Sequence, residues 1–298
     1  MKAYLFPGQG SQFIGMGSDL YKKYFIAKKL FQLSNDILGF KITDIMFSKH
    51  SMNILKETQY TQLSIYIYSF IKIKTLSNFY PDMVSGHSLG EFSALAAINA
   101  FSFEEGLILV KKRAQIMQKI CERISGGMAV ILGLEDELVE RVCYQQTRST
   151  NGDRIVVPSN YNAHKQIVIS GEYQTLKKVC HILYQIGAKK ILYLPVHGAF
   201  HSPIMEPAKK ALEKLIKNIH FHPPICPIYQ NIHGKPVINC IEIKKNLIEQ
   251  TTSPVKWKQS IKNMMIDGAT LFEEISQKKF LIKMVKNIIN HYDHINVK

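Results

Sequence analysis

The sequence predicts an α/β fold in which one large domain is interrupted by a small insert. Short apolar segments typical of strands alternate with amphipathic segments typical of helices, the order changes after Gly126, and the first alternation returns after Val196. The 298 residues, 46% of them hydrophobic and 20% charged, suffice for a large core with a small additional unit. We therefore expect a packed α/β protein rather than a disordered chain.

The N-terminal part of the large domain begins with a strand and a Gly-rich turn. Residues 2–6 (KAYLF) have the pattern of a short strand, which ends at the turn Pro7–Gly10. Apolar residues at helical spacing follow this turn. We expect helices over 17–38 and 59–76, a strand that ends at 83–84, and helices over 89–99 and 103–121.

The insert has a different order of elements. From Gly126 to Val196 the patterns predict strand, helix, strand, strand, helix, strand, the order of a ferredoxin-like split βαβ unit. These elements are expected over 127–134, 135–148, 154–160, 166–171, 172–187 and 189–196. The large domain is then expected to resume with a helix over 202–219, a strand over 226–229, helices over 243–250 and 256–266, a strand over 269–274 and a terminal helix.

Composition and charge restrict the partners and the compartment. The formal charge is +15, and 33 Lys but only 5 Arg are spread along the chain. A general bias towards Lys, Ile and Asn explains this as well as a basic patch that attracts acidic partners. Without a basic block, a zinc-finger spacing or an aromatic-basic motif, nucleic acid is not the expected partner. The five Cys form no Cys-x-x-Cys pair, so we expect no disulfides. The apolar runs are too short for a membrane span, and the sequence shows no signal-peptide pattern. Together these features indicate a cytoplasmic protein.

The stretch VSGHSLGEFSALAA (residues 84–97) carries the strongest indication of chemistry. It places Gly-His-Ser-Leu-Gly between a predicted strand and an Ala-rich predicted helix, which is the pattern of a nucleophile elbow. Such an elbow exposes the hydroxyl of Ser88, and the N–H of Leu89 at the start of the helix becomes an oxyanion donor. The alternative is a Gly-Ser turn in which Ser88 only caps the helix.

A serine nucleophile needs a base, and His201 in GAFHSP is the candidate because it comes late in the chain at an expected loop-to-helix junction. His87 adjoins Ser88 but is expected to point elsewhere. His197 and His201 have the i, i+4 spacing of a metal pair, but an intervening Gly and a nearby Pro argue against a continuous helix, so no metal site is expected. No Asp or Glu between Ser88 and His201 stands out as the partner of the imidazole, and a backbone carbonyl can replace one.

Arg113 in KKRAQIMQ and Gln9 in PGQG are two further candidates. Arg suits bidentate binding of a carboxylate, although the spacing alone favours a solvated Arg on an amphipathic helix. Gln9 offers a second backbone N–H to an oxyanion from its Gly-flanked turn, although that stretch on its own is only a turn.

Together these features resemble the malonyl-CoA:acyl-carrier-protein transacylases of fatty-acid synthesis and the related acyltransferase domains of polyketide synthases. The resemblance runs nearly from end to end of the chain. It is carried by FPGQGSQFIGMG (6–17), TQYTQLS (58–64), GHSLGEFSALAA (86–97), KKRAQIMQ (111–118), GGMAVILG (126–133), NYNAHKQIVISG (160–171), GAFHSPIMEPA (198–208), PIYQNIHGKP (227–236) and LIEQTTSPVKW (247–257).

The resemblance implies a role for each residue of the reacting centre. Ser88 is the acylated nucleophile and His201 is its base. The backbone N–H groups of Gln9 and Leu89 form the oxyanion hole. Gln250 presents its backbone carbonyl to the ring N–H of His201, which supplies the partner that no carboxylate provides.

Three further residues are implied to bind the acyl group. Arg113 pairs with the free carboxylate of the malonyl group, and Gln62 lines the acyl pocket. Phe200, before the His, and Leu89, after the nucleophile, resemble members that are selective for malonyl over methylmalonyl groups, because Phe narrows the pocket where a branch would lie.

The resemblance also implies the fold and the reaction. The expected architecture is an α/β-hydrolase-like core with a parallel sheet, formed by residues 1–124 and 198–298, interrupted by a small ferredoxin-like (βαββαβ) subdomain, residues 125–197. The expected reaction moves malonyl from malonyl-CoA to the phosphopantetheine thiol of holo acyl carrier protein in two ping-pong steps, for fatty-acid synthesis. We expect a monomer without a bound cofactor or metal, whose acidic carrier binds transiently.

Three alternative functions stay open, and two segments depart from the family pattern. The alternatives are a trans-acting acyltransferase for polyketide-synthase carrier domains, a serine esterase or thioesterase, and a non-catalytic subunit that binds a carrier. His197 stands where the family usually has a small residue and is expected to lie near His201. The segment EEISQKKF (273–280) replaces the usual Gly-Pro-Gly turn before the last helix.

Overall fold

The structure, a computed structural model, describes residues 1–148, 154–196 and 198–292. Its strands form two separate sheets. The first sheet comprises β1 (Lys2–Phe6), β2 (Met83–Gly86), β7 (Ile228–Tyr229), β8 (Pro236–Val237) and β9 (Leu271–Glu274), in the order β8-β7-β2-β1-β9. All neighbours in it are parallel except β7 and β8, which pair antiparallel at one edge.

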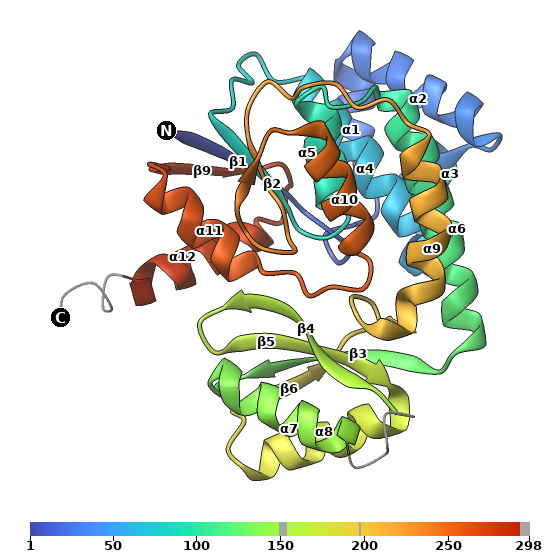
Figure 1. Cartoon of the computed structure of the whole chain (residues 1–298). Coiled ribbons are helices and arrows are strands. Elements are labelled where there is room, and N and C mark those ends of the chain that lie inside the picture. The colour runs from blue at the N-terminus through green and yellow to red at the C-terminus, as the bar shows by residue number, and fades with distance from the viewer. Residues whose placement is uncertain (149–153, 197, 293–298) are drawn as a thin grey trace.

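The second sheet is antiparallel throughout. It comprises β3 (Gly126–Leu132), β4 (Val156–Ala163), β5 (Gln166–Glu172) and β6 (Lys190–Tyr193), in the order β4-β5-β3-β6. The helices α7 (Asp136–Arg148) and α8 (Tyr173–Gln185) lie on the face of this sheet that is turned away from the rest of the molecule (Figure 1). The chain is therefore a mixed α/β protein with one mainly parallel and one antiparallel sheet.

The remaining helices surround the parallel sheet. They are α1 (Ser18–Lys23), α2 (Phe25–Leu38), α3 (Ile42–Phe47), α4 (Thr58–Lys74), α5 (Gly90–Ala97), α6 (Phe103–Arg123), α9 (Glu206–Lys217), α10 (Cys240–Glu249), α11 (Trp257–Ile266) and α12 (Phe280–Tyr292). Short 3-10 turns occupy Lys49–Ser51, Ile54–Lys56 and Pro203–Met205. Among the described residues, no helix combines the length and the apolar character needed to cross a membrane.

Strand β1 explains why the parallel sheet is covered on both faces. Tyr4 and Phe6 point into the core that includes residues of α4, α5 and α6, whereas Ala3 and Leu5 point to the core formed with α11 and α12. Side chains alternate between the two faces of a strand, so an unbroken apolar run buries both faces. Figure 1 shows the corresponding layers, with α4 and α5 on one side of the sheet and α11 and α12 on the other.

The N-terminal helical region differs from the sequence prediction. Instead of one helix over 17–38, the chain bends at Tyr24, whose backbone is extended with φ −118° and ψ 128°. The bend allows Tyr21 of α1 to pack edge-on against Phe31 and Phe47, with ring centroids 5.8 and 5.6 Å apart. Tertiary packing of aromatic rings therefore overrides the helical periodicity.

The segment 273–280 forms a turn held by side chains. Ser276 donates its hydroxyl to one oxygen of the Glu274 carboxylate at 2.5 Å, and the other oxygen accepts the N–H of Ile282 at 3.0 Å. Lys279, directly before α12, has the left-handed φ of 51° that usually favours Gly. The unusual sequence here still permits a sharp turn, which the hydrogen bonds of the buried Glu274 stabilise.

Candidate active site

Ser88 lies on a strained turn between β2 and α5. Its φ of 54° is left-handed, a conformation that costs on the order of 1–3 kcal/mol for a residue other than Gly. Two glycines allow the turn to be so tight, because a Cβ on Gly86 would lie 2.0 Å from the carbonyl carbon of Gly90, and a Cβ on Gly90 would lie 2.1 Å from the oxygen of Phe6. The Gly-x-Ser-x-Gly pattern thus forms the expected elbow, with the Ser side chain at its apex.

The structure brings His201 and Gln250 to Ser88 across long stretches of sequence. The hydroxyl oxygen of Ser88 lies 2.7 Å from Nε2 of His201, and Nδ1 of His201 lies 2.9 Å from the carbonyl oxygen of Gln250. Because a carbonyl only accepts, Nδ1 carries the ring proton and Nε2 is free to accept from Ser88. In the described part of the chain, no Asp or Glu carboxylate is hydrogen-bonded to His201.

Burial keeps the His201 ring neutral. The side chain is only 4% exposed, and this burial, aided by the positive charge of Arg113, lowers its pKa to about 3. His87 lowers the pKa further, while the carbonyls of Gln250 and Ser253 oppose the shift. A neutral imidazole with a free Nε2 is the form that can take a proton from the Ser88 hydroxyl.

The reaction of Ser88 with a fluorophosphonate, a reagent for activated serines, is therefore expected to stay fast well into the acid range. Protonation of His201 removes the base, and the lowered pKa shifts that loss from the usual value near 6.5 towards pH 3. We expect a constant labelling rate from pH 8 down to about pH 5. Labelling rates measured where circular dichroism shows an intact fold check this, and a rate that halves near pH 6.5 would contradict it.

Arg113 is buried beside the nucleophile. Its guanidinium donates to Oε1 of Gln62 at 2.5 Å and to the hydroxyl oxygen of Ser88 at 3.3 Å, and it lies 5.3 Å from the ring centroid of Phe92. The side chain is 2% exposed, so the alternative of a solvated Arg is wrong. Burial lowers its pKa to about 10, which leaves it charged at neutral pH. Its Nε has no partner among the described residues, so this cation has hydrogen-bonding capacity for an anion next to Ser88.

The backbone N–H groups of Gln9 and Leu89 face no acceptor within the described ranges. Leu89 is the N-cap residue of helix α5, and the N–H groups at the start of a helix are unpaired by geometry. Gly8 packs against His87 so closely that a Cβ on it would lie 2.3 Å from the His87 carbonyl oxygen, which places the turn with Gln9 against the elbow. Two free donors near a nucleophile are what an oxyanion hole requires.

Gln62 contacts Arg113, and Phe200 directly precedes His201 in the sequence. Gln62 on α4 is 1% exposed and accepts from Arg113, while its amide nitrogen lies 3.6 Å from the sulfur of Met117. Phe200 is 6% exposed and shares an apolar cluster with Met117 and Met128. Met117 therefore contacts Gln62 and belongs to the same apolar cluster as Phe200.

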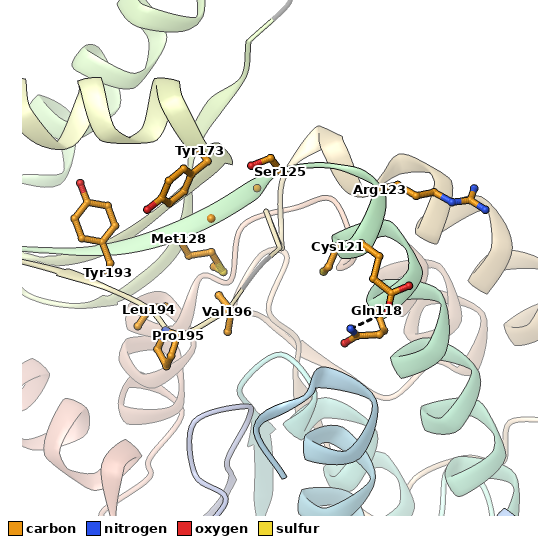
Figure 2. A pocket seen from close by; sticks show the side chains of 13 residues that line it. Gln118, Cys121, Arg123, Ser125, Met128, Tyr173, Tyr193, Leu194, Pro195 and Val196 are labelled. Atoms are coloured by element: carbon orange, nitrogen blue, oxygen red, sulfur yellow. Dashed lines mark hydrogen bonds between the residues drawn. The ribbon is translucent and has the colours of Figure 1, made fainter. Parts of the chain in front are cut away.

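A hollow of about 780 Å³ lies where the end of α6 meets β3 and the segment after β6 (Figure 2). Cys121, Met128 and Val196 come from these three places and border the same space. Met128 belongs to the cluster that contains Phe200, whereas Ser88 is not among the lining residues. The hollow is therefore not bordered by the nucleophile.

Sequence reasoning missed three polar residues that support the elbow. Asn231 accepts the N–H of Ser88 at 2.7 Å and donates to the carbonyl of Gly86 at 2.7 Å. Asn162 of β4 lies 2.9 Å from Nε2 of His87, which turns that ring away from the dyad. The third is Glu91, the one ionisable residue of the fully buried helix α5, and that contrast was a usable signal.

No metal site was expected from the sequence. Among the described residues, no group of three or more His, Cys, Asp or Glu side chains is placed to hold a metal ion. His197, the other half of the considered metal pair, lies outside the residues that the structure describes. His201 instead has both ring nitrogens engaged by Ser88 and Gln250.

Comparison with known proteins places the chain in a family. A family model described as an acyl transferase domain matches residues 3–297. The chain belongs to this acyl transferase family. The match spans nearly the entire sequence, so both sheets of this acyltransferase lie within the family region.

Individual relatives confirm the resemblance that the motifs indicated. The acyltransferase is 35% identical over 288 residues to the malonyl CoA-acyl carrier protein transacylase of Bacillus subtilis (strain 168), covering 96% of this chain and 90% of the relative. It is 36% identical over 293 residues to a polyketide biosynthesis malonyl CoA-acyl carrier protein transacylase, PksC, of the same strain, covering 97% of each. A solved structure described as a type II polyketide-synthase acyl-carrier protein in complex with its malonyl-transacylase matches with a TM-score of 0.92 and 29% identity, covering 97% of this chain and 93% of that chain.

Proposed function

We propose that this acyltransferase moves the malonyl group from malonyl-CoA to the phosphopantetheine thiol of an acyl carrier protein, through a malonyl ester on Ser88, and so supplies fatty-acid synthesis. One observation carries the proposal: the Ser88 hydroxyl lies between the free Nε2 of His201, at 2.7 Å, and the buried guanidinium of Arg113, at 3.3 Å. His201 can activate Ser88, and the cation of Arg113 next to it can bind an acyl group that ends in a carboxylate. The names of the relatives support the same substrates.

In the first step, Ser88 attacks the thioester carbonyl of malonyl-CoA while Nε2 of His201 takes the hydroxyl proton. The N–H groups of Gln9 and Leu89 donate to the oxygen that becomes negative. The carbonyl of Gln250 holds Nδ1–H and so orients the ring as it becomes charged. The tetrahedral intermediate then collapses, CoA leaves as the thiol with the proton from His201, and the malonyl ester remains on Ser88.

In the second step, the carrier's thiol enters where CoA left. His201 takes the thiol proton, the thiolate attacks the ester, and Ser88 recovers its proton as malonyl leaves on the carrier. A hydrolase would activate water at the same point. The partner of His201 here is the neutral carbonyl of Gln250 rather than a carboxylate, which makes the ring a milder base and favours a thiol over water as the acceptor.

Replacing Arg113 with Ala is expected to weaken the use of malonyl-CoA specifically. Loss of a charge-assisted contact costs about 1.5–3 kcal/mol, so kcat/KM for malonyl-CoA falls roughly 10- to 150-fold. For acetyl-CoA, which lacks the carboxylate, kcat/KM is expected to fall less. The Arg113→Lys variant keeps the charge but lacks the bidentate fork, so its kcat/KM for malonyl-CoA is expected to lie between those of the parent and Arg113→Ala. The measurement is kcat/KM for both thioesters in each variant. An Arg113→Ala enzyme that transfers malonyl as fast as the parent would remove this role.

Gln62 and Phe200 are proposed to shape the acyl pocket. Gln62 holds one nitrogen of Arg113 and so directs the guanidinium, and Phe200 narrows the space next to Met117 where a methyl branch of the acyl group would lie. Leu89, directly after the nucleophile, is buried as well. These positions favour malonyl over methylmalonyl groups.

We further propose how the two sheets correspond to domains. The mainly parallel sheet with helices on both faces suits an α/β-hydrolase-like core of residues 1–124 and 198–298. The order β4-β5-β3-β6, with α7 and α8 on one face, suits a ferredoxin-like subdomain of residues 125–197. We infer a cytoplasmic monomer that needs no bound cofactor or metal and meets an acidic carrier transiently, as the charge of +15 favours.

Steady-state kinetics with two substrates tests the proposal. Initial rates of carrier malonylation at several fixed concentrations of holo acyl carrier protein are expected to give parallel double-reciprocal lines, the signature of ping-pong transfer. Release of free malonate at the rate of CoA release would favour a serine esterase or thioesterase instead. Because PksC serves polyketide biosynthesis by its name, comparing carriers of the two pathways at equal concentration decides between fatty-acid supply and a trans-acting polyketide role.

A further inference from the structure

Glu91 is a carboxylate buried directly behind the nucleophile elbow. It lies in the first turn of α5, three residues after Ser88, and its side chain is fully buried. A buried carboxylate is costly unless hydrogen bonds compensate it. Here each oxygen has a donor: Oε1 accepts the backbone N–H of Asn231, and Oε2 accepts Nε2 of Gln250 at 2.6 Å.

The contact with Gln250 leads to His201. The same amide nitrogen of Gln250 also donates to the backbone carbonyl of Ser88 at 3.0 Å, while Oε1 of Gln250 has no partner among the described residues. The side chain of Gln250 is therefore held through its nitrogen alone, by Glu91 and Ser88. The backbone carbonyl of Gln250 is the group that accepts Nδ1–H of His201. Glu91 thus fixes the residue that orients the base.

The contact with Asn231 leads to the elbow itself. The Asn231 side chain accepts the N–H of Ser88 and donates to the carbonyl of Gly86, each at 2.7 Å, so it bridges both sides of the turn. Glu91 holds the backbone of Asn231 in place for this bridge. One carboxylate therefore joins three segments that are remote in sequence: the elbow, the segment around Asn231, and the end of α10 with Gln250.

We propose that Glu91 is a positioning residue, which sets the distance between Ser88 and His201 by holding Asn231 and Gln250 from behind. It contacts neither the acyl group nor the reacting atoms. The inference rests on the proposed function for the reaction that it serves, but the geometry concerns the activation of Ser88 towards any electrophile. Burial raises the pKa of Glu91 to about 8, and the donors from Asn231 and Gln250 together with the charge of Arg113 oppose that shift without cancelling it.

Glu91→Gln tests this at constant size. The new Gln side chain has one oxygen and one NH₂ group. The NH₂ group would therefore face either the N–H of Asn231 or the amide of Gln250, and both of these are donors. We expect fluorophosphonate labelling of Ser88 to slow roughly 10- to 100-fold, as for a misplacement of about 1 Å in an active site. We expect kcat for malonyl transfer to fall by the same factor and KM for malonyl-CoA to change less than about threefold.

Glu274→Gln is the matched control. Glu274 is also a buried carboxylate with two donors, Ser276 and Ile282, but it lies at the end of β9, which β1 separates from the strand before Ser88. Its replacement is expected to lower the melting temperature without slowing the labelling of Ser88. Labelling of Glu91→Gln within twofold of the parent, or equal slowing in both variants, would overturn the proposal.

Gln250→Ala provides a second test that keeps Glu91 intact. It removes the amide between Glu91 and Ser88 but leaves the backbone carbonyl that accepts from His201. Slowed labelling supports the proposal and unchanged labelling overturns it, even if Glu91→Gln does not fold. A parent enzyme that reacts with the fluorophosphonate but forms no adduct with malonyl-CoA would refute the proposed function, and the labelling comparison would still decide the role of Glu91.

Discussion

Ser88→Ala is expected to lower carrier malonylation by a factor on the order of 10⁶, because the variant lacks the atom that forms the ester. Residual catalysis from the oxyanion donors and substrate binding sets the remaining rate. Binding of malonyl-CoA should persist, since Arg113 and the pocket are unchanged. Transfer to holo carrier, followed by mass spectrometry of the carrier, measures the loss, and calorimetry measures the retained binding.

Ser93→Ala is a suitable control for this variant. Ser93 lies on the same helix α5, is fully buried, and its hydroxyl has no partner in the described part of the chain. Removing it should leave transfer within a few-fold of the parent. A Ser88→Ala enzyme with more than a few per cent of parental transfer would mean that another group accepts the malonyl moiety.

His201→Ala is expected to slow both half-reactions by roughly 10⁴- to 10⁶-fold. Without the imidazole, no base takes the proton of Ser88 when it attacks malonyl-CoA. Likewise, no base takes the proton of the carrier thiol when it attacks the ester. Single-turnover CoA release measures the first step, and transfer from a preformed adduct measures the second. The exposed His181 provides the control, because His181→Ala removes an imidazole from α8, on the face of the antiparallel sheet that is turned away from the rest of the molecule.

An intermediate result for His201→Ala would be informative. If CoA release slows but transfer from the ester proceeds normally, another base serves the second step. If both steps stay near parental rates, the assignment of His201 as the base is wrong, and the 2.7 Å contact with Ser88 has a purely structural role.

The sequence predicted much of the fold because its local signals agree with the tertiary structure. Strand β1 is an apolar run that ends at a Gly-rich turn, β2 leads directly into the Gly-x-Ser-x-Gly pattern, and the order of elements from β3 to β6 appears in the alternating patterns. The break at Tyr24 could not be predicted, since it depends on ring contacts with residues far along the chain. The strand expected over 226–229 contains β7, whereas β8 was not predicted, because two residues are too few to show a period.

The reacting residues were predicted from motifs, whereas their supports were not. Ser88 and His201 carry recognisable local context, and the structure brings them within hydrogen-bonding distance. The spacing of Arg113 alone predicted a solvated side chain, and only the resemblance to the family predicted that it belongs to the site. Glu91 accepts a hydrogen bond from the backbone N–H of Asn231, which is 140 residues further along the chain. No local sequence pattern reveals such a contact.

The most direct test of the account is the intact mass of the protein after incubation with malonyl-CoA alone, and again after holo acyl carrier protein is added. We predict a single malonyl adduct, located on Ser88 by peptide mapping, that persists without carrier and moves to the carrier thiol when it is present. Continuous CoA release with free malonate and no adduct would contradict transfer and indicate a hydrolase. No adduct and no CoA release would contradict catalysis on malonyl-CoA altogether.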